Sequence, residues 1–388
     1  MTEKEELFQL LSALVAIDSV NCDLIPGAKG ECEIAAYVRD WLSRRGIEVE
    51  RQATRRPGRS NVVGWVRGRG GGRSLMLNAH MDTVGVAGMS TPFSTAVKDG
   101  RLFGRGAMDT KGALAAFMSA LVGVSQLDLC GDVVLAAVVD EEYASAGTEA
   151  VAAAYHTDAA IVGEPTGLQV VTAHKGFIWF DVETRGIAAH GSLPDVGVDA
   201  IAKMGGVLVE IERLAERLRQ HALHPVLGSG SIHASLIRGG QEFSSYPAAC
   251  TLSLERRTVP GETVDGVEKE LRAVLELVGS RDPSFVGTLR TRLAREPFEA
   301  RKDDPIVLAI SRQVASYTGR NALLSGMSGW LESALLVRAG ISSVVFGPAG
   351  DGLHGETEWV DLESVWACRE IVRGTIREYC APCGTKMG

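Results

Sequence analysis

A histidine and an aspartate two residues apart end one apolar segment of this 388-residue sequence, in the run LMLNAHMDTV at positions 75–84. Side chains two apart on a strand point to the same side, so His80 and Asp82 are expected to emerge together where the strand enters a loop. A carboxylate can orient an imidazole for a metal ion: one ring nitrogen binds the ion and the other donates to the carboxylate. The same pair could serve a nucleophile instead, and the neighbouring polar residues must decide between the two interpretations.

Carboxylates and a second histidine follow other apolar segments. Asp109 lies in GRGAMDTKG, Glu141 and Glu142 in VVLAAVVDEEY, Glu164 in AAIVGEPTG, and His354 in GDGLHGETEWV. In open α/β sheets, sites form outside the carboxyl ends of the strands, so these residues could converge on one edge. Histidine and carboxylate ligands without cysteine suit Zn²⁺, Mn²⁺ or Co²⁺. One carboxylate can bridge two ions, which together acidify water and polarise a carbonyl in many hydrolases.

Each of these residues also has a simpler interpretation. Taken alone, Glu141 and Glu142 are typical of a solvated acidic loop, and a lone His80 or His354 is typical of a hydrogen-bonded surface or core residue. On an extended chain, however, adjacent side chains point in opposite directions, so one glutamate can face a metal and the other the substrate. A carboxylate outside the ligand set can then carry the proton from the attacking water to the leaving nitrogen.

The composition is that of an ordinary globular protein. The sequence is 45% hydrophobic and 23% charged, its formal net charge is −8, and no basic cluster typical of nucleic-acid binding stands out. The seven cysteines are scattered and odd in number, which fits a reducing compartment; the C-x-x-C pair Cys380 and Cys383 has no second pair nearby. We find no signal peptide and no apolar run of the roughly 18 residues that a membrane span needs. We therefore expect a cytoplasmic protein with neither a membrane nor a nucleic-acid partner.

The order of the predicted elements indicates an α/β protein with an inserted domain. Strands alternate with helices up to residue 176, which predicts a mainly parallel sheet covered on both faces. A strand–helix–strand–strand–helix order over residues 177–298 predicts a small α+β domain, and the α/β rhythm returns over residues 299–388. The catalytic domain is thus expected in two segments, 1–176 and 299–388, on either side of the insert.

Together and in this order, the motifs resemble those of the M20 metallopeptidase family, which includes acetylornithine deacetylases, succinyl-diaminopimelate desuccinylases, aminoacylases and glutamate carboxypeptidases. The resemblance covers nearly the whole chain. It implies two divalent ions, expected to be Zn²⁺ with Co²⁺ or Mn²⁺ as alternatives. One ion would take His80, Asp109 and Glu164, and the other Asp109, Glu142 and His354. Glu141 would be the general base, and Asp82 would orient His80.

The resemblance extends to the insert, which it implies to be a lid and dimerisation domain. GIAAHGSLPDVGVDA resembles the lid motif, which implies that His190 reaches the active site of a partner subunit and stabilises the oxyanion there. Its simpler interpretation is a loop histidine that precedes a helix. LERRTVPGE resembles a segment that implies Arg257 as the ligand of a substrate carboxylate, a task that suits the guanidinium fork. Arg256, on the opposite face of the strand, is predicted to be solvated.

Three departures from the family pattern bear on substrate choice rather than on the metal ligands. Thr110 stands where many relatives have methionine after the bridging aspartate. Ser244 and Ser245 replace a substrate-binding asparagine segment. Leu331 and Glu332 stand where a threonine–aspartate pair is common.

These features predict a homodimeric, two-metal hydrolase that cleaves the amide of an N-acyl amino acid, of the acetylornithine deacetylase or aminoacylase type. A dipeptidase or carboxypeptidase of the same family is an alternative function, since these enzymes also cleave an amide next to a carboxylate. A third alternative is an inactive, metal-binding homologue, against which stands the presence of Glu141.

Overall fold

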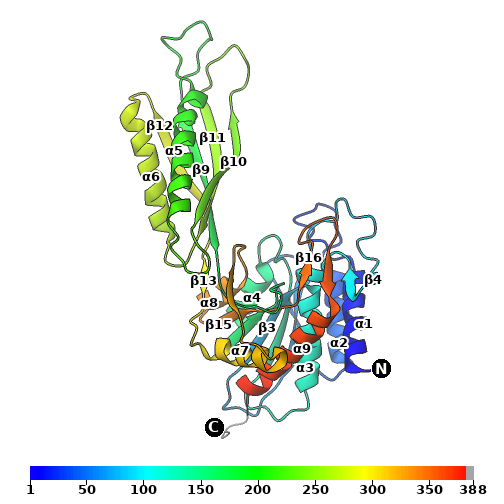
Figure 1. Ribbon diagram of the computed structural model, residues 1–388. Coiled ribbons are helices and arrows are strands. Elements are labelled where there is room, and N and C mark those ends of the chain that lie inside the picture. Colours follow the sequence, from blue (N-terminus) through cyan, green and yellow to red (C-terminus); the bar gives the residue numbers. More distant parts are fainter. Residues whose placement is uncertain (382–388) are drawn as a thin grey trace. The chain divides into compact units, whose positions relative to one another are not determined.

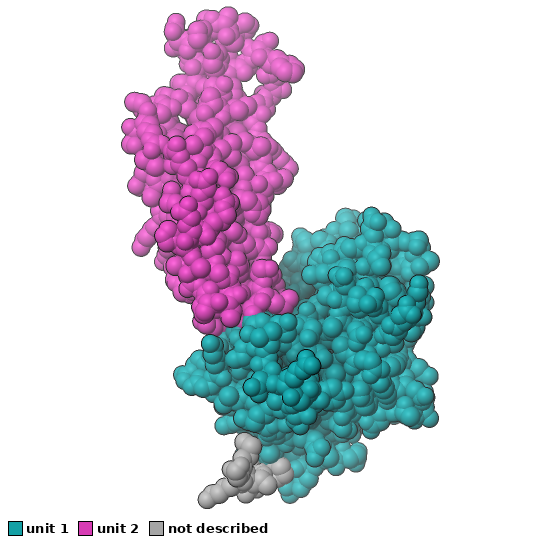
Figure 2. Space-filling model, in the orientation of Figure 1, with its two compact units in different colours: residues 1–172, 300–325, 332–388 teal, residues 173–299, 326–331 magenta. Residues whose placement is uncertain are grey.

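The computed structural model describes residues 1–381, which form two compact units (Figures 1 and 2). The first unit contains residues 1–172, 300–325 and 332–381, and the second contains residues 173–299 and 326–331. The chain thus leaves the first unit after residue 172 and returns at residue 300, where the sequence predicted breaks after residues 176 and 298. Residues 326–331 belong to the second unit, although the prediction assigned them to the catalytic domain. Cys383 of the C-x-x-C pair lies outside the described residues.

A mixed sheet forms the centre of the first unit. Within residues 1–381 it has nine strands in the order β1-β2-β6-β3-β7-β15-β8-β13, with β14 beside β8. The strands are β1 (Glu48–Ala53), β2 (Ser60–Val66), β3 (Leu75–His80), β6 (Val133–Val138), β7 (Ala159–Val162), β8 (Val170–His174), β13 (Phe298–Glu299), β14 (Leu324–Met327) and β15 (Ser342–Val345). β3 pairs in parallel with β6 and β7, and β7 pairs in parallel with β15, whereas β1, β2, β8 and β13 pair antiparallel. The predicted α/β class is confirmed, with parallel pairing at the centre of the sheet.

Helices cover this sheet because alternate strand residues point to opposite faces. Leu75, Leu77 and Ala79 of β3 belong to one hydrophobic core with five helices. These helices are α1 (Glu3–Ala16), α2 (Cys32–Ser43), α3 (Gly112–Val124), α7 (Pro305–Thr318) and α9 (Leu362–Tyr379). Within this layer α3 packs along α9 (Figure 1). The shorter helices α4 (Ala146–Ala154) and α8 (Ser333–Arg338) lie outside this core and contact each other.

The segment Ala107–Val124 is long and apolar enough to span a membrane by length and composition alone. The prediction that no such segment exists is therefore wrong. However, 78% of the segment is buried within the fold, as expected of a core helix. Leu114, Phe117, Met118 and Leu121 of α3 all lie in the core of the first unit.

A second, small sheet links two distant parts of the first unit. Its strands are β4 (Val97–Lys98), β5 (Arg101–Phe103), β16 (Gly350–Asp351) and β17 (Trp359–Asp361), in the order β16-β17-β5-β4. Antiparallel pairing of Trp359 with Phe103 and of Asp361 with Arg101 brings the chain before Asp109 beside the chain after His354. The sequence analysis missed this sheet, because strands of two or three residues are too short to show alternation.

The second unit is a four-stranded antiparallel sheet with two helices on one face. Its strands are β9 (Gly176–Arg185), β10 (Ser231–Gly239), β11 (Ala249–Thr258) and β12 (Val286–Arg295), in the order β10-β11-β9-β12, and its helices are α5 (Ala200–Gln220) and α6 (Val264–Arg281). The side chains of Asp199 and Thr263 cap the two helices by accepting hydrogen bonds from backbone N–H groups of the first turn. The inward-facing residues of the strands pack on both helices in one core. The sequence analysis predicted this order of elements but not the last strand, β12.

Candidate metal centre

The parallel centre of the main sheet brings three predicted ligand segments to one edge. β6, β3 and β7 are neighbours, so the residues that follow their carboxyl ends lie side by side. His80 is the last residue of β3, Glu141 and Glu142 follow β6, and Glu164 follows β7. Ligand atoms of His80, Asp109 and Glu164 lie within 4.8 Å of one another, as do those of Asp109, Glu142 and His354. These are the two ligand sets that the sequence analysis named.

The carboxylate of Asp109 lies between two imidazole rings. Its Oδ1 is 3.1 Å from Nε2 of His80, and its Oδ2 is 3.1 Å from Nε2 of His354. Burial acts to raise the pKa of Asp109, but the hydrogen bonds to His354 and His80 outweigh it and lower that pKa. Hydrogen bonds to Asp109 and Glu142 raise the pKa of His354 to about 10. Each oxygen of one carboxylate thus faces a different histidine, as a ligand that bridges two ions must.

The orientation of His80 is set by a backbone carbonyl. Its Nδ1 lies 3.0 Å from the carbonyl oxygen of Asp82, which can only accept, so Nδ1 carries the proton and Nε2 is left to bind. The Asp82 carboxylate is farther away, with its Oδ1 3.7 Å from Nδ1. The sequence analysis expected the carboxylate of Asp82 to orient His80, whereas the closer contact comes from the main chain of Asp82.

The carboxylate of Asp82 instead holds the acidic loop after β6. Its two oxygens accept hydrogen bonds from the backbone N–H groups of Glu141 and Glu142, each at 3.1 Å. Asn21 donates to the same carboxylate at 2.7 Å. Asp140, which precedes the pair, has a φ of 70°, a left-handed conformation that reverses the chain there. Asp82 thus connects β3 to the loop that carries both glutamates.

The other carboxylates share a buried and crowded region. Burial raises the pKa of Glu142 to about 7, and the charge of Asp109 adds to the shift. Burial also raises the pKa of Glu164 and that of Glu141 well above the ordinary range for a glutamate, although the charge of His80 opposes this. Ionised carboxylates are costly in such a region unless a cation lies among them.

These observations fit divalent metal ions. The donor set contains only imidazole nitrogens and carboxylate oxygens, which are ordinary ligands of Zn²⁺ and similar ions. Oε1 of Glu142 is buried and has no hydrogen-bond partner among the described residues, so it has a lone pair to offer. Geometry alone also permits a set of His80, Glu141 and Glu142, so it does not by itself separate a ligand from a base at Glu141.

Glu332, one of the departures from the family pattern, belongs to the same acidic region. It is buried, its Oε2 accepts a hydrogen bond from Thr148 at 2.6 Å, and burial raises its pKa to about 7. Its charge contributes to the raised pKa values of Glu141 and Glu164, so it lies near both. The sequence analysis noted this residue but did not include it in the site.

His190 and Arg257 belong to the second unit, in which each has a defined environment. His190 is exposed; its Nδ1 lies 2.8 Å from Oγ of Ser192 and accepts a hydrogen bond from the backbone N–H of Ser192 at 3.2 Å, which leaves Nε2 as the donor. The backbone of Ser244 accepts a hydrogen bond from Gly191 at 2.7 Å, which joins the serine segment to the His190 loop. Arg257 donates to Glu255 at 2.7 Å and lies over the ring of Phe177.

The prediction that Arg256 is solvated is wrong. Its side chain is only 2% exposed, pairs with Glu262, and lies 3.4 Å from a carboxylate oxygen of Glu270 on α6. The alternation of Cys250, Leu252 and Leu254 places Arg256 on the face that the helices cover. That pattern was present in the sequence and could have predicted its burial.

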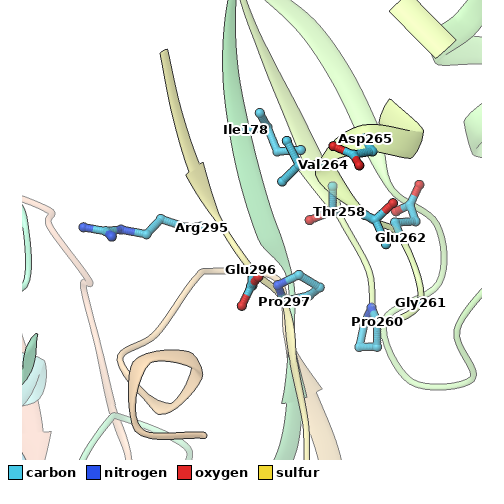
Figure 3. Close-up of a pocket in the computed structure, with 11 residues that line it drawn as sticks. Ile178, Thr258, Pro260, Gly261, Glu262, Val264, Asp265, Arg295, Glu296 and Pro297 are labelled. Carbon is cyan, nitrogen blue, oxygen red and sulfur yellow. The ribbon is translucent and has the colours of Figure 1, made fainter. Parts of the chain in front are cut away.

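A cavity of about 450 Å³ in the second unit contains none of the predicted site residues. Figure 3 shows Thr258, Glu262 and Val264 in its wall, with the side chain of Arg295 extending away from them. Glu262 is already bound to Arg256 and, at 2.8 Å, to the backbone N–H of Val259. This wall is therefore held by a structural ion pair, and we assign no ligand to the cavity.

Comparison with known proteins identifies the class of protein that this fold and this site define. Residues 76–378 match the model of peptidase family M20/M25/M40. The chain is 30% identical over 384 residues to an acetylornithine deacetylase of Myxococcus xanthus, covering 95% of this chain and 96% of that protein. The chain therefore belongs to peptidase family M20/M25/M40 and is a hydrolase of that family.

Solved structures share the fold at lower sequence identity. The aminopeptidase PepT of Bacillus cereus superposes with a TM-score of 0.78 at 18% identity, over 97% of this chain and 99% of that chain. The YXEP protein of Bacillus subtilis, described as a dinuclear metal-binding peptidase of the M20 family, superposes with a TM-score of 0.76 at 16% identity, over 97% of this chain and 98% of that chain.

Proposed function

We propose that this protein is a two-metal amidohydrolase that removes the acyl group from an N-acyl amino acid, as an acetylornithine deacetylase does. The observation that carries the proposal is the Asp109 carboxylate, whose two oxygens face two different histidines. Two divalent ions held there would acidify a water molecule and polarise the scissile carbonyl. We expect Zn²⁺, with Co²⁺ or Mn²⁺ as alternatives, and a cytoplasmic homodimer.

The protein's own residues would divide the remaining work. Asp109 would bridge the two ions, with His80 and Glu164 on one of them and Glu142 and His354 on the other. Glu141 would accept the proton of the attacking water and return it to the leaving nitrogen. Its raised pKa supports this role, because a carboxylate of higher proton affinity takes the proton of water more readily.

The second unit would supply the contacts to the substrate. The Nε2–H of His190 would donate to the oxyanion in the active site of the partner subunit, as the family resemblance implies. Arg257 lies on the sheet face that the helices leave uncovered, where its guanidinium can bind the carboxylate of the amino acid.

The test is a hydrolysis screen with metal-stripped and metal-loaded protein. We expect chelation to abolish turnover and Zn²⁺, Co²⁺ or Mn²⁺ to restore it, because the ions supply several kcal/mol of transition-state stabilisation. Acetyl, succinyl and formyl amino acids should be compared with dipeptides by kcat/KM. Faster cleavage of dipeptides would favour the dipeptidase alternative, and no turnover by the loaded protein on any substrate would refute the proposal.

His190→Ala is expected to lower kcat by about 10²–10³-fold, the usual effect of removing one oxyanion donor, with metal content unchanged. His221→Ala, an exposed histidine at the end of α5, is the matched control and should be neutral. Mixed dimers of His190→Ala and Glu141→Gln chains test whether His190 acts on the partner subunit. Activity should recover on mixing if it does, and failure to recover would place the action of His190 within its own subunit.

Alanine substitutions of the neighbours Arg256 and Arg257 are expected to have different effects, the first on stability and the second on KM. Arg256→Ala removes a buried side chain and leaves the charge of Glu262, which is only 14% exposed, without its partner, so it should lower the free energy of unfolding by about 3–5 kcal/mol. Arg257→Ala removes a partly exposed pair and should change stability by less than about 1 kcal/mol while it raises KM. Urea unfolding and steady-state kinetics of both variants check this, and an unchanged KM for Arg257→Ala would contradict its assigned role.

A further inference from the structure

Glu358 occupies the centre of a buried hydrogen-bond cluster next to the candidate metal centre. Its side chain is 0% exposed. Oε1 accepts from the backbone N–H groups of Met108 at 2.9 Å and Asp109 at 3.1 Å. Oε2 accepts from the backbone N–H of Gly106 at 2.9 Å and from Nη1 of Arg105 at 2.7 Å. A carboxylate can accept about four hydrogen bonds, so the accepting capacity of Glu358 is filled. All four donors lie on the loop that carries Asp109.

The backbone of that loop needs such a partner. Asp109 has φ −117° and ψ 93°, so the chain is not helical there and its N–H groups lack the acceptors that a helix would provide. Gly106 has φ 81°, and a Cβ at this position would lie 2.7 Å from Cγ2 of Thr83. The loop is therefore irregular and tightly packed, and its conformation depends on an acceptor from outside.

Arg105 extends the cluster to two further loops. It is 2% exposed, and besides Glu358 it donates from Nε to the carbonyl of Gly85 at 3.0 Å and from Nη2 to the carbonyl of Gly355 at 2.9 Å. Gly355 follows His354 directly, and Gly85 lies three residues after Asp82. One buried ion pair thus joins the segments that carry Asp82, Asp109 and His354.

Stability alone does not explain this ion pair. Removing two charges from water is costly, and a well-packed apolar pair of similar size is often as stable. An apolar pair could not accept hydrogen bonds from three backbone N–H groups of one loop. It also could not donate hydrogen bonds to the carbonyl groups of two other loops.

We propose that Glu358 and Arg105 are positioning residues that hold Asp109 and His354 in the geometry required by the metal centre. This inference rests on the proposed metal-dependent function and adds to it two residues that bind neither ion. Groups that orient metal ligands in this way typically contribute about 10–100-fold to metal affinity or activity. The ion bound by Asp109, Glu142 and His354 depends most on the pair, because the pair binds the backbone N–H of Asp109 and the carbonyl of Gly355, which directly follows His354.

The test compares Glu358→Gln with Glu356→Gln, an exposed glutamate of the same loop. Glutamine has nearly the same size as glutamate. Its N–H₂ group, however, would face backbone N–H donors with which it cannot form a hydrogen bond, and it lacks the negative charge that pairs with Arg105. We expect about 10–100-fold weaker binding of one ion in calorimetric titrations of the stripped protein with Zn²⁺, and a changed visible spectrum of the Co²⁺-loaded protein. Turnover should fall in kcat more than it rises in KM, and Glu356→Gln should match the wild type.

Arg105→Lys is the second variant, which keeps the positive charge and all three backbone bonds of Glu358. A single ammonium cannot reproduce the fork that reaches Glu358, Gly85 and Gly355, so we expect an intermediate loss of metal affinity even if Glu358→Gln does not fold. If the folded variants bind both ions as tightly as the wild type and give its Co²⁺ spectrum, the proposal is wrong, and lower melting temperatures alone would indicate a purely structural role. Wild-type protein that binds no ions would instead refute the proposed function.

Discussion

Asp109→Ala is expected to abolish the binding of both metal ions and with it the activity. Asp109 is the one predicted ligand common to both sets, and its two oxygens face His80 and His354. Without it, each ion would keep only two of its three protein ligands, and the two ions would lose the carboxylate charge between them. The loss of several kcal/mol of transition-state stabilisation corresponds to roughly 10³-fold or more in kcat/KM.

His354→Ala is the informative comparison for this variant. It removes a ligand from one set only and leaves His80, Asp109 and Glu164 in place. Metal content after dialysis should therefore fall to zero for Asp109→Ala but be retained in part for His354→Ala. Equal metal content in Asp109→Ala and the wild type would show that Asp109 is not the bridge.

Glu141→Gln is expected to separate metal binding from catalysis. The amide is nearly the same size as the carboxylate but cannot accept and release a proton at neutral pH. General acid–base catalysis typically contributes about 10²–10⁴-fold, so kcat should fall by this factor while both ions are retained. Metal content, the Co²⁺ spectrum and kcat are the measurements.

Glu142→Gln is the matched variant, since it changes the adjacent residue in the same way. A carboxylate oxygen of Glu142 lies 3.5 Å from Nε2 of His354, and its other oxygen is buried without a partner among the described residues. Replacing Glu142 should therefore weaken the binding of one ion. The geometry also permits Glu141 as a ligand. Loss of an ion from Glu141→Gln rather than from Glu142→Gln would therefore exchange the two assigned roles.

Much of the candidate site could be predicted from the sequence because several candidate ligands directly follow strands. Apolar segments that end in His80, Glu142 and Glu164 become neighbouring parallel strands, and parallel strands present their carboxyl ends at one edge. Asp109 and His354 were different. They were noticed as candidates, but no pattern in the sequence showed how they come together, because the small sheet that joins their segments consists of strands too short to be recognised.

Two errors have a common cause in side-chain pairing. Arg256 was predicted to be solvated although the alternation of its strand places it on the covered face; what the sequence does not show is that Glu262 and Glu270 would pair with it. Asp82 was predicted to hold His80 through its carboxylate, whereas that carboxylate binds the backbone of Glu141 and Glu142. In each case a residue type was correctly noticed, and its partner was decided by packing.

The sequence by itself determined the family, the alternation of strands and helices, and the identity of the metal-binding candidates, because these depend on local periodicity and on motifs in a set order. The tertiary structure alone decided how the candidates are held. Asp109 lies between two histidines that are 29 and 245 residues away along the chain, and Glu358 holds its loop from 249 residues away. Such contacts follow from strand pairing and close packing across the fold, and no local pattern in the sequence encodes them.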